Sequence, residues 1–95
     1  MPVCLIMHFA GVEASTYEAV MKELRLRDAN PDWPSGMISH VAGFTSDGMY
    51  VVDVWESQQD FDAFLESRLM PAFEALGGLP QPQTTTFDVY NSYTA

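Results

Sequence analysis

The sequence predicts an α+β fold in which four strands and two helices follow the order β-α-β-β-α-β. This is the ferredoxin-like arrangement, with a four-stranded antiparallel sheet. Three observations support it: the chain opens on a continuous apolar run, its centre holds two strand-like runs joined at an Asp-Gly turn, and two further segments carry apolar stripes at helical spacing. Both helices then cover one face of the sheet, and the other face stays open.

The first two elements are a strand and an amphipathic helix. Residues 3–9 form an unbroken apolar run rich in strand formers, and Gly11 ends it. Ser15 and Glu18 fit a capping box, which predicts a helix that begins at Ser15. The residues that follow at i, i+3, i+4 and i+7 give this helix one apolar stripe, formed by Tyr17, Val20, Met21 and Leu24.

The centre of the chain predicts a β-hairpin. Residues 30–36 contain two prolines and a glycine and mark a loop. Residues 37–45 and 49–56 are strand-like, and Asp47-Gly48 is the turn dipeptide between them.

The second half of the chain predicts a helix and a last strand. Ser57 caps the helix, with Asp60 at the box position, and Pro71 predicts a kink or break near Leu69 with a short helical piece to residue 76. Gly77-Gly78 ends this piece. Residues 84–93 are dense in Thr, Phe, Val and Tyr and predict the fourth strand. The stripe of this helix consists of Phe61, Phe64, Leu65 and Leu69.

Length and composition predict a single domain over residues 1–95 that gains stability by self-association. A chain of this length buries only about 60–65% of its unfolded surface, so its core is thin. The single cysteine, Cys4, cannot form an internal disulfide, while hydrophobic residues make up 47% of the chain. We therefore expect a homodimer.

The net charge limits the partners that we expect, and the first residues of the chain limit the expected location. Four basic and thirteen acidic residues give a formal net charge of −9. Nucleic acid and anionic membrane surfaces repel such a chain, so we expect neither as a partner. The apolar run at the start has no basic segment before it and is too short for a signal peptide or a membrane span, and a cytoplasmic location is expected.

Strand alternation assigns side chains to the two faces of the sheet. An even hairpin loop places Val51, Asp53 and Trp55 on the same face as His40, Ala42 and Phe44. The alternate set is small and apolar, which suggests that it lies under the helices: Val41, Gly43, Val52 and Val54. In the first strand Val3, Leu5, Met7 and Phe9, and in the last strand Phe87 and Val89, are expected to face the helices. The open face then gathers a few polar groups among apolar neighbours, as small-molecule pockets do: His8, His40, Asp53, Trp55 and Tyr90.

Several runs of residues resemble a known family over nearly the whole chain: 40–43, 47–48, 52–57, 61–64 and 68–71. The chain resembles the antibiotic biosynthesis monooxygenase-like group of the dimeric α+β barrel superfamily. The resemblance implies that the open faces of two sheets pair to close a barrel. It also implies a cavity for a small aromatic or polyketide-like ligand, either between each sheet and its helices or where the two subunits meet. The superfamily includes cofactor-independent oxygenases, heme-degrading enzymes, lactone isomerases and polyketide cyclases, and fold alone does not choose among them. Heme-degrading members use an Asn, a Trp and a His. Trp55 corresponds to the Trp, but the first strand has no Asn and the second helix has no His.

The candidate catalytic residues are His40 and Asp53. A carboxylate that accepts from one imidazole nitrogen sets the tautomer and makes the other nitrogen a better base. The hypothesis is that His40 removes a proton from a phenol or an activated C–H, while the residues expected to contact the substrate are His8, Phe44, Trp55 and Tyr90. The alternative is a His–Asp pair that only stabilises the dimer.

These expectations lead to a cofactor-independent monooxygenase-like oxidoreductase that needs no cofactor or metal. A metal held by His8, His40 and Asp53 would match a 2-His-1-carboxylate set, but no spaced motif supports it. Two other readings stay open: a non-catalytic barrel that binds a small ligand or merely dimerises, and a cyclase or isomerase of the same superfamily. Tyr17 is interpreted as a core residue, and Trp33 as the anchor of its loop.

Overall fold

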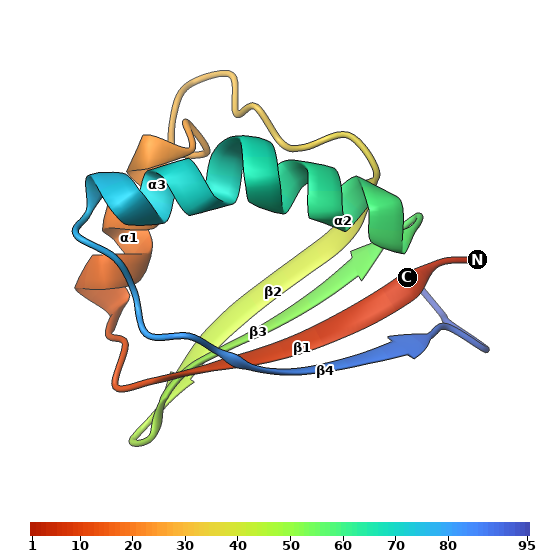
Figure 1. Cartoon of the computed structure of the whole chain (residues 1–95). Helices are drawn as coiled ribbons and strands as arrows, with labels where there is room; N and C mark the ends of the chain where they lie inside the picture. The colour runs from red at the N-terminus through yellow and green to blue at the C-terminus, as the bar shows by residue number, and fades with distance from the viewer.

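The computed structural model describes residues 1–95 and confirms the predicted fold class. The elements are β1 (Val3–Ala10), α1 (Ala14–Glu23), β2 (Met37–Thr45), β3 (Gly48–Trp55), α2 (Gln58–Phe64), the π-helical segment η1 (Leu65–Leu69), α3 (Met70–Ala75) and β4 (Gln83–Asp88). The strands pair antiparallel in the order β2-β3-β1-β4. Figure 1 shows all the helices on one side of the sheet.

The core lies between the helices and one face of the sheet. Alternate residues of β1 are at most 6% exposed, as predicted for its helix-facing side: Val3, Leu5, Met7 and Phe9. The helices meet them with buried side chains of their stripes: Val20, Met21, Phe61 and Phe64. Alternation in the strand and the 3.6-residue period in the helices thus bring apolar surfaces together.

The Asp-Gly turn of the central hairpin also holds the end of β1. Gly48 has a φ of +129°, and a Cβ at this position would collide with the carbonyl oxygen of Phe9 and the amide nitrogen of Gly11. The amide of Gly11 donates to the carbonyl of Asp47 at 3.1 Å. A glycine is required at position 48 because only glycine accepts both this φ and this close approach.

The start of α1 differs from the prediction. The N-cap is Glu13, its side chain makes no capping hydrogen bond, and Ser15 lies inside the first turn. The capping box of Ser15 and Glu18 was therefore wrong. The carboxylate of Glu18 instead accepts two hydrogen bonds from Arg27.

The second helix confirms its predicted cap and shows how Pro71 is accommodated. The hydroxyl oxygen of Ser57 accepts from the amide of Asp60 at 3.1 Å. The predicted break near Leu69 takes the form of η1, in which the amide of Met70 donates to the carbonyl of Leu65, five residues earlier. Proline has no amide hydrogen to continue the normal ladder. The wider turn absorbs that defect, and the chain stays helical through Pro71 into α3.

β4 is shorter than predicted. It ends at Asp88, opposite Val3, and one further backbone hydrogen bond joins the amide of Val89 to the carbonyl of Pro2. Beyond this point the neighbouring strand has ended, so residues 89–93 have no ladder to join. None of the helices has both the length and the apolar character needed to cross a membrane.

Candidate functional site

The predicted pairing across the hairpin is confirmed, but the predicted face is wrong. His40 pairs with Asp53 and Ala42 pairs with Val51, so these side chains do share a face. On the other side, Asp53 pairs with Leu5 of the helix-facing set. Directly opposite residues of an antiparallel ladder lie on the same face. Asp53 is only 4% exposed and points under the helices.

The opposite face carries the small apolar set that was expected under the helices. Val41 is 63% exposed there, and Ile6 from β1 is 37% exposed. β4 is also reversed, because Thr86 pairs with Leu5 while Phe87 pairs with Cys4 on the open side. Burying the larger side chains Met49, Val51 and Trp55 removes more apolar surface from water than burying the small set.

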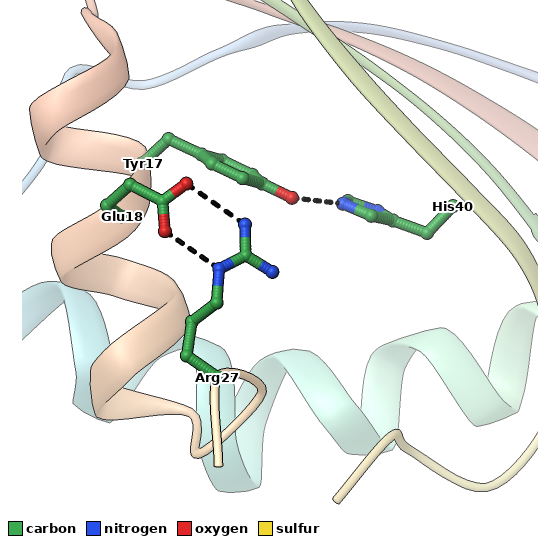
Figure 2. A network of polar contacts seen from close by, with 4 residues as sticks. All are labelled: Tyr17, Glu18, Arg27 and His40. Atoms are coloured by element: carbon green, nitrogen blue, oxygen red, sulfur yellow. Dashed lines mark hydrogen bonds and ion pairs between the residues drawn. The ribbon is translucent and has the colours of Figure 1, made fainter. Parts of the chain in front are cut away.

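The site centres on a short hydrogen-bonded chain of three side chains. Nδ1 of His40 lies 2.6 Å from Oδ1 of Asp53, and the two side chains are only 14% and 6% exposed. An ionised carboxylate only accepts hydrogen bonds, so Nδ1 carries the hydrogen and Nε2 has the lone pair. The hydroxyl of Tyr17 then donates to Nε2 at 2.8 Å, as Figure 2 shows.

This chain of three residues borders an apolar cavity between the sheet and the helices. The cavity measures about 60 Å³, and 15 of the 17 residues that line it are hydrophobic. Its polar members are His40 and Asp53, and the Tyr17 ring is part of its wall. A space of this size corresponds to about two water molecules. It therefore suits a small, mostly apolar ligand with one polar group.

The loop between α1 and β2 closes one side of the cavity. Its Trp33 ring lies 5.7 Å from the ring of His40 and is 45% exposed. Arg68, from η1, holds the start and the middle of the loop: it donates to the carbonyl of Leu24 at 2.8 Å and to that of Asp32 at 2.9 Å. Leu24 is the C-cap of α1, so Arg68 also satisfies a helix-end carbonyl.

Tyr17 is held from two sides. Its ring meets the edge of Phe44 at 6.2 Å, and the guanidinium of Arg27 lies 5.9 Å from its centroid. Glu18 accepts from Arg27 at 2.7 and 3.0 Å and keeps it in place (Figure 2). Burial raises the pKa of Tyr17 above its ordinary value, and the charge of Arg27 offsets part of this rise.

The other predicted site residues do not join this group. His8 lies on the open face, stacked on Tyr50 at 4.3 Å, and Tyr90 is fully exposed beyond β4. Phe44 touches the site only through Tyr17. Because His8 and Asp53 lie on opposite faces of the sheet, they cannot share a metal ion with His40, and no other group of three His, Cys, Asp or Glu residues converges.

Trp55 is a core residue instead of a surface for stacking a substrate. It has no exposed surface and lies between the rings of Phe61 at 5.6 Å and Phe64 at 5.4 Å. Its indole N–H has no hydrogen-bond acceptor, which is uncommon for a buried donor.

Two residues of the site were missed from the sequence. Tyr17 was assigned to the core and Trp33 to its loop, yet both line the cavity beside His40. Tyr17 had one recognisable signal: it is the only polar-tipped residue in an otherwise apolar stripe, and a buried tyrosine hydroxyl needs a partner. Nothing in the local sequence places Trp33 near His40.

The sheet order, the helices on one face and the cavity between them define a ferredoxin-like α+β protein with the fold of the antibiotic biosynthesis monooxygenases. No protein-family model and no curated protein sequence matches the chain. Solved structures do match it, at identities that establish the fold alone. One, from Chloroflexus aurantiacus, is provisionally assigned as an antibiotic biosynthesis monooxygenase; it has a TM-score of 0.68, 14% identity, and coverage of 99% of this chain and 98% of that one.

Two further neighbours have named activities. SnoaB from Streptomyces nogalater, described as a cofactor-independent oxygenase, has a TM-score of 0.61 and 17% identity, with 96% of this chain and 94% of that one covered. The monooxygenase ActVA-Orf6 from Streptomyces coelicolor, in complex with nanaomycin D, has a TM-score of 0.54 and 20% identity, with coverage of 99% and 91%.

Proposed function

We propose that the chain is a cofactor-independent monooxygenase-like enzyme, an oxidoreductase that acts on a small aromatic or polyketide-like phenol. The observation that carries this proposal is the hydrogen-bonded His40–Asp53 pair at the edge of an otherwise apolar cavity. A base with a fixed tautomer beside apolar walls is suited to ionising a flat, weakly acidic molecule. The activities of the fold neighbours SnoaB and ActVA-Orf6 point to the same class.

The roles of the residues follow from their positions. Asp53 orients His40 and stabilises the imidazolium that forms when Nε2 takes up a proton. The apolar walls exclude water and hold the ring of the substrate. The electron-rich phenolate then reacts with O₂ and itself supplies all four electrons. One oxygen atom replaces a ring hydrogen and the other leaves as water with two hydrogens of the substrate, so the phenol becomes a quinone without an external reductant.

The cavity is smaller than a single-ring substrate needs. An apolar cavity that binds benzene measures about 150 Å³, compared with about 60 Å³ here. Entry of a phenol therefore requires the loop with Trp33 to move outward, and Arg68 opposes this movement because it binds the carbonyls of Leu24 and Asp32.

We also propose a homodimer that forms through the open face of the sheet. This face exposes three large apolar side chains, with exposed fractions of 37% for Ile6, 63% for Val41 and 48% for Phe87. Contiguous apolar surface of this kind marks an interaction site. Val41→Asp replaces the most exposed of these three side chains with a charged one and is expected to give a monomer in light scattering. A mass unchanged at dimer size would contradict this interface.

A binding protein that does no chemistry is the second candidate, because Tyr17 already occupies Nε2 of His40. A cyclase or isomerase is compatible with the same proton abstraction. An oxygen electrode combined with product analysis separates these candidates. An oxygenase consumes O₂ with a phenolic substrate, an isomerase converts its substrate without O₂, and a binding protein changes neither the O₂ concentration nor the ligand.

The direct test is O₂ uptake with a panel of phenols, naphthols and hydroxyanthrones. His40→Gln and Asp53→Asn are expected to lower the rate about 100-fold or more, the usual contribution of a general base. Lys22→Gln, an exposed change on α1, is the control and is expected to keep the wild-type rate. An active protein that keeps its full rate in His40→Gln would contradict the base assignment.

A further inference from the structure

The structure places a phenol of the protein's own at the basic nitrogen of the proposed catalytic pair. We propose that Tyr17 is a catalytic residue that takes the proton of the substrate's hydroxyl and passes its own proton to Nε2 of His40. This inference rests on the proposed function, since it concerns how a phenolic substrate in the same cavity is ionised. The chain of contacts that carries it runs from Tyr17 through His40 to Asp53, at 2.8 and 2.6 Å.

Direct contact between a substrate and the base is blocked. The side chain of His40 is 14% exposed, one of its nitrogens faces Asp53 and the other accepts from Tyr17. Tyr17 and His40 both line the cavity, but the Tyr17 hydroxyl lies between the cavity and Nε2. A hydroxyl group has one hydrogen and two lone pairs, so its oxygen can donate to Nε2 and still accept from a ligand.

The neighbours of Tyr17 hold its side chain in one position. It stands on α1, and its ring is bounded by Phe44 and by Arg27, whose guanidinium is held by Glu18 (Figure 2). In Figure 2 the Tyr17 hydroxyl points at the nearest ring nitrogen of His40, which is Nε2. Proton transfer needs this kind of alignment, and a rigid helix supplies it better than a loop.

The proton balance of the step is complete without a further reactant. The O–H bond of the substrate breaks and a new O–H bond forms on Tyr17, while the original Tyr17 proton moves to Nε2 of His40. The products are a substrate phenolate, a neutral tyrosine and an imidazolium paired with the Asp53 carboxylate. Two protons have each moved once, which gives a net transfer of one proton from the substrate to Nε2, and no electrons have been gained or lost.

A resting tyrosinate does not serve as the base. Burial raises the pKa of Tyr17, so its phenol keeps its proton at neutral pH. The proton acceptor is therefore Nε2 of His40, and Tyr17 relays the proton from the cavity to that nitrogen.

The test uses 4-nitrophenol as the probe, because its phenolate is yellow and its neutral form is not. At a slightly acid pH, where the free probe is mostly neutral, titration with the wild-type protein is expected to produce the phenolate band. Tyr17→Phe keeps a ring in front of His40 but has no hydroxyl, so the probe is expected to bind without the band. Tyr93→Phe, a fully comparable change at an 89% exposed tyrosine, is the control and is expected to retain it.

A second variant distinguishes a proton conductor from a structural tyrosine. Tyr17→Ala removes the ring, and the hydroxyl of the probe can then reach Nε2 directly. The band is expected to return in Tyr17→Ala and to disappear in Tyr17→Ala/His40→Gln, with circular dichroism checking that each variant is folded. Protonation of His40 on binding is followed independently through its imidazole resonances.

The possible outcomes separate this inference from the proposed function. A full phenolate band in Tyr17→Phe, or none in the wild type, would overturn the relay. A loss in Tyr17→Phe that Tyr17→Ala does not restore would also overturn it, because it assigns Tyr17 a purely structural role. The proposed function fails on different evidence, namely the absence of O₂ uptake with every phenol, and the probe experiment does not depend on O₂.

Discussion

Removing one partner of the His40–Asp53 pair tests whether the pair is held for stability or for chemistry. We consider His40→Leu, Asp53→Leu and the double variant. Leucine is close to histidine in volume and has the same number and branching of side-chain heavy atoms as aspartate, so neither change leaves an empty space in place of the polar interaction.

His40→Leu leaves the Asp53 carboxylate 4% exposed and without its hydrogen-bond donor. Removal of one partner from a buried pair costs about 3–5 kcal/mol. Because the side chain of His40 keeps 14% exposure, water can reach the edge of the site, and we expect the lower end of that range, about 3 kcal/mol. In a domain of this size, a change of about 3 kcal/mol lowers Tm by about 12–24 °C.

The other two variants are expected to cost less. Asp53→Leu leaves an imidazole that can stay neutral, and an unsatisfied N–H costs about 1–3 kcal/mol. The double variant leaves no buried charge without a partner, and the Tyr17 hydroxyl that loses its acceptor is only partly buried, so water can replace Nε2. We expect its stability to lie within about 1 kcal/mol of the wild type, since apolar replacement of a whole buried pair is often neutral or stabilising.

The assay is urea unfolding followed by far-UV circular dichroism at neutral pH and at one fixed protein concentration, because any self-association shifts apparent stability. A double variant as stable as the wild type, but without activity, means that the pair is retained for chemistry. The reasoning is refuted if His40→Leu costs less than about 1 kcal/mol, or if the double variant is less stable than His40→Leu alone.

Three further predictions concern the core, the loop and the thiol. Trp55→Ala is expected to lower the free energy of unfolding by about 3–5 kcal/mol, because the side chain is fully buried against two phenylalanine rings. Chemical denaturation measures this loss, and an equal loss in Trp33→Ala, where the tryptophan is half-exposed, would contradict the assignment of Trp55 to the core. Arg68→Ala removes two hydrogen bonds to loop carbonyls and is expected to speed amide hydrogen exchange in residues 25–36 while β1 keeps its protection; unchanged exchange in the loop would show that Arg68 does not hold it. Burial, and to a smaller degree the charge of Asp53, raises the pKa of the Cys4 thiol, so the folded protein disfavours the thiolate and its stability falls as pH rises above the ordinary thiol range. Ellman's reagent is expected to react far more slowly with the folded than with the unfolded protein at mildly alkaline pH, and equal rates would refute this.

The fold was largely predictable because its signals are local. The Asp-Gly dipeptide marks the hairpin turn, and Gly48 must be glycine for a reason that its φ makes clear. Ser57 was correctly predicted as a cap, since a cap depends on the next three residues only. The errors lie in α1 and β4. The N-cap of α1 is Glu13, so Ser15 lies inside the first turn, and residues 89–93 extend past Val3, the first residue of β1, where the ladder has no further partner.

The pairing of His40 with Asp53 was predicted from the sequence, but the residues that surround the pair were not. The sequence paired His40 with Asp53 because residues on two neighbouring strands alternate together. It could not indicate Tyr17 or Trp33 as neighbours of His40, since one comes from a helix and the other from a loop. Their approach to His40 depends on how the helical layer and the loop sit on the sheet.

The sequence by itself determined the order of the elements, the turn between β2 and β3, and which side chains share a face of the hairpin. Only the tertiary structure decided which of the two faces lies under the helices. A period of two specifies the alternation but not its sign. The pairing with β1 decides which face is buried: Leu5 belongs to the core, and Asp53 lies directly opposite it, so the carboxylate of Asp53 also points under the helices. There His40 and Tyr17 complete the hydrogen-bonded network.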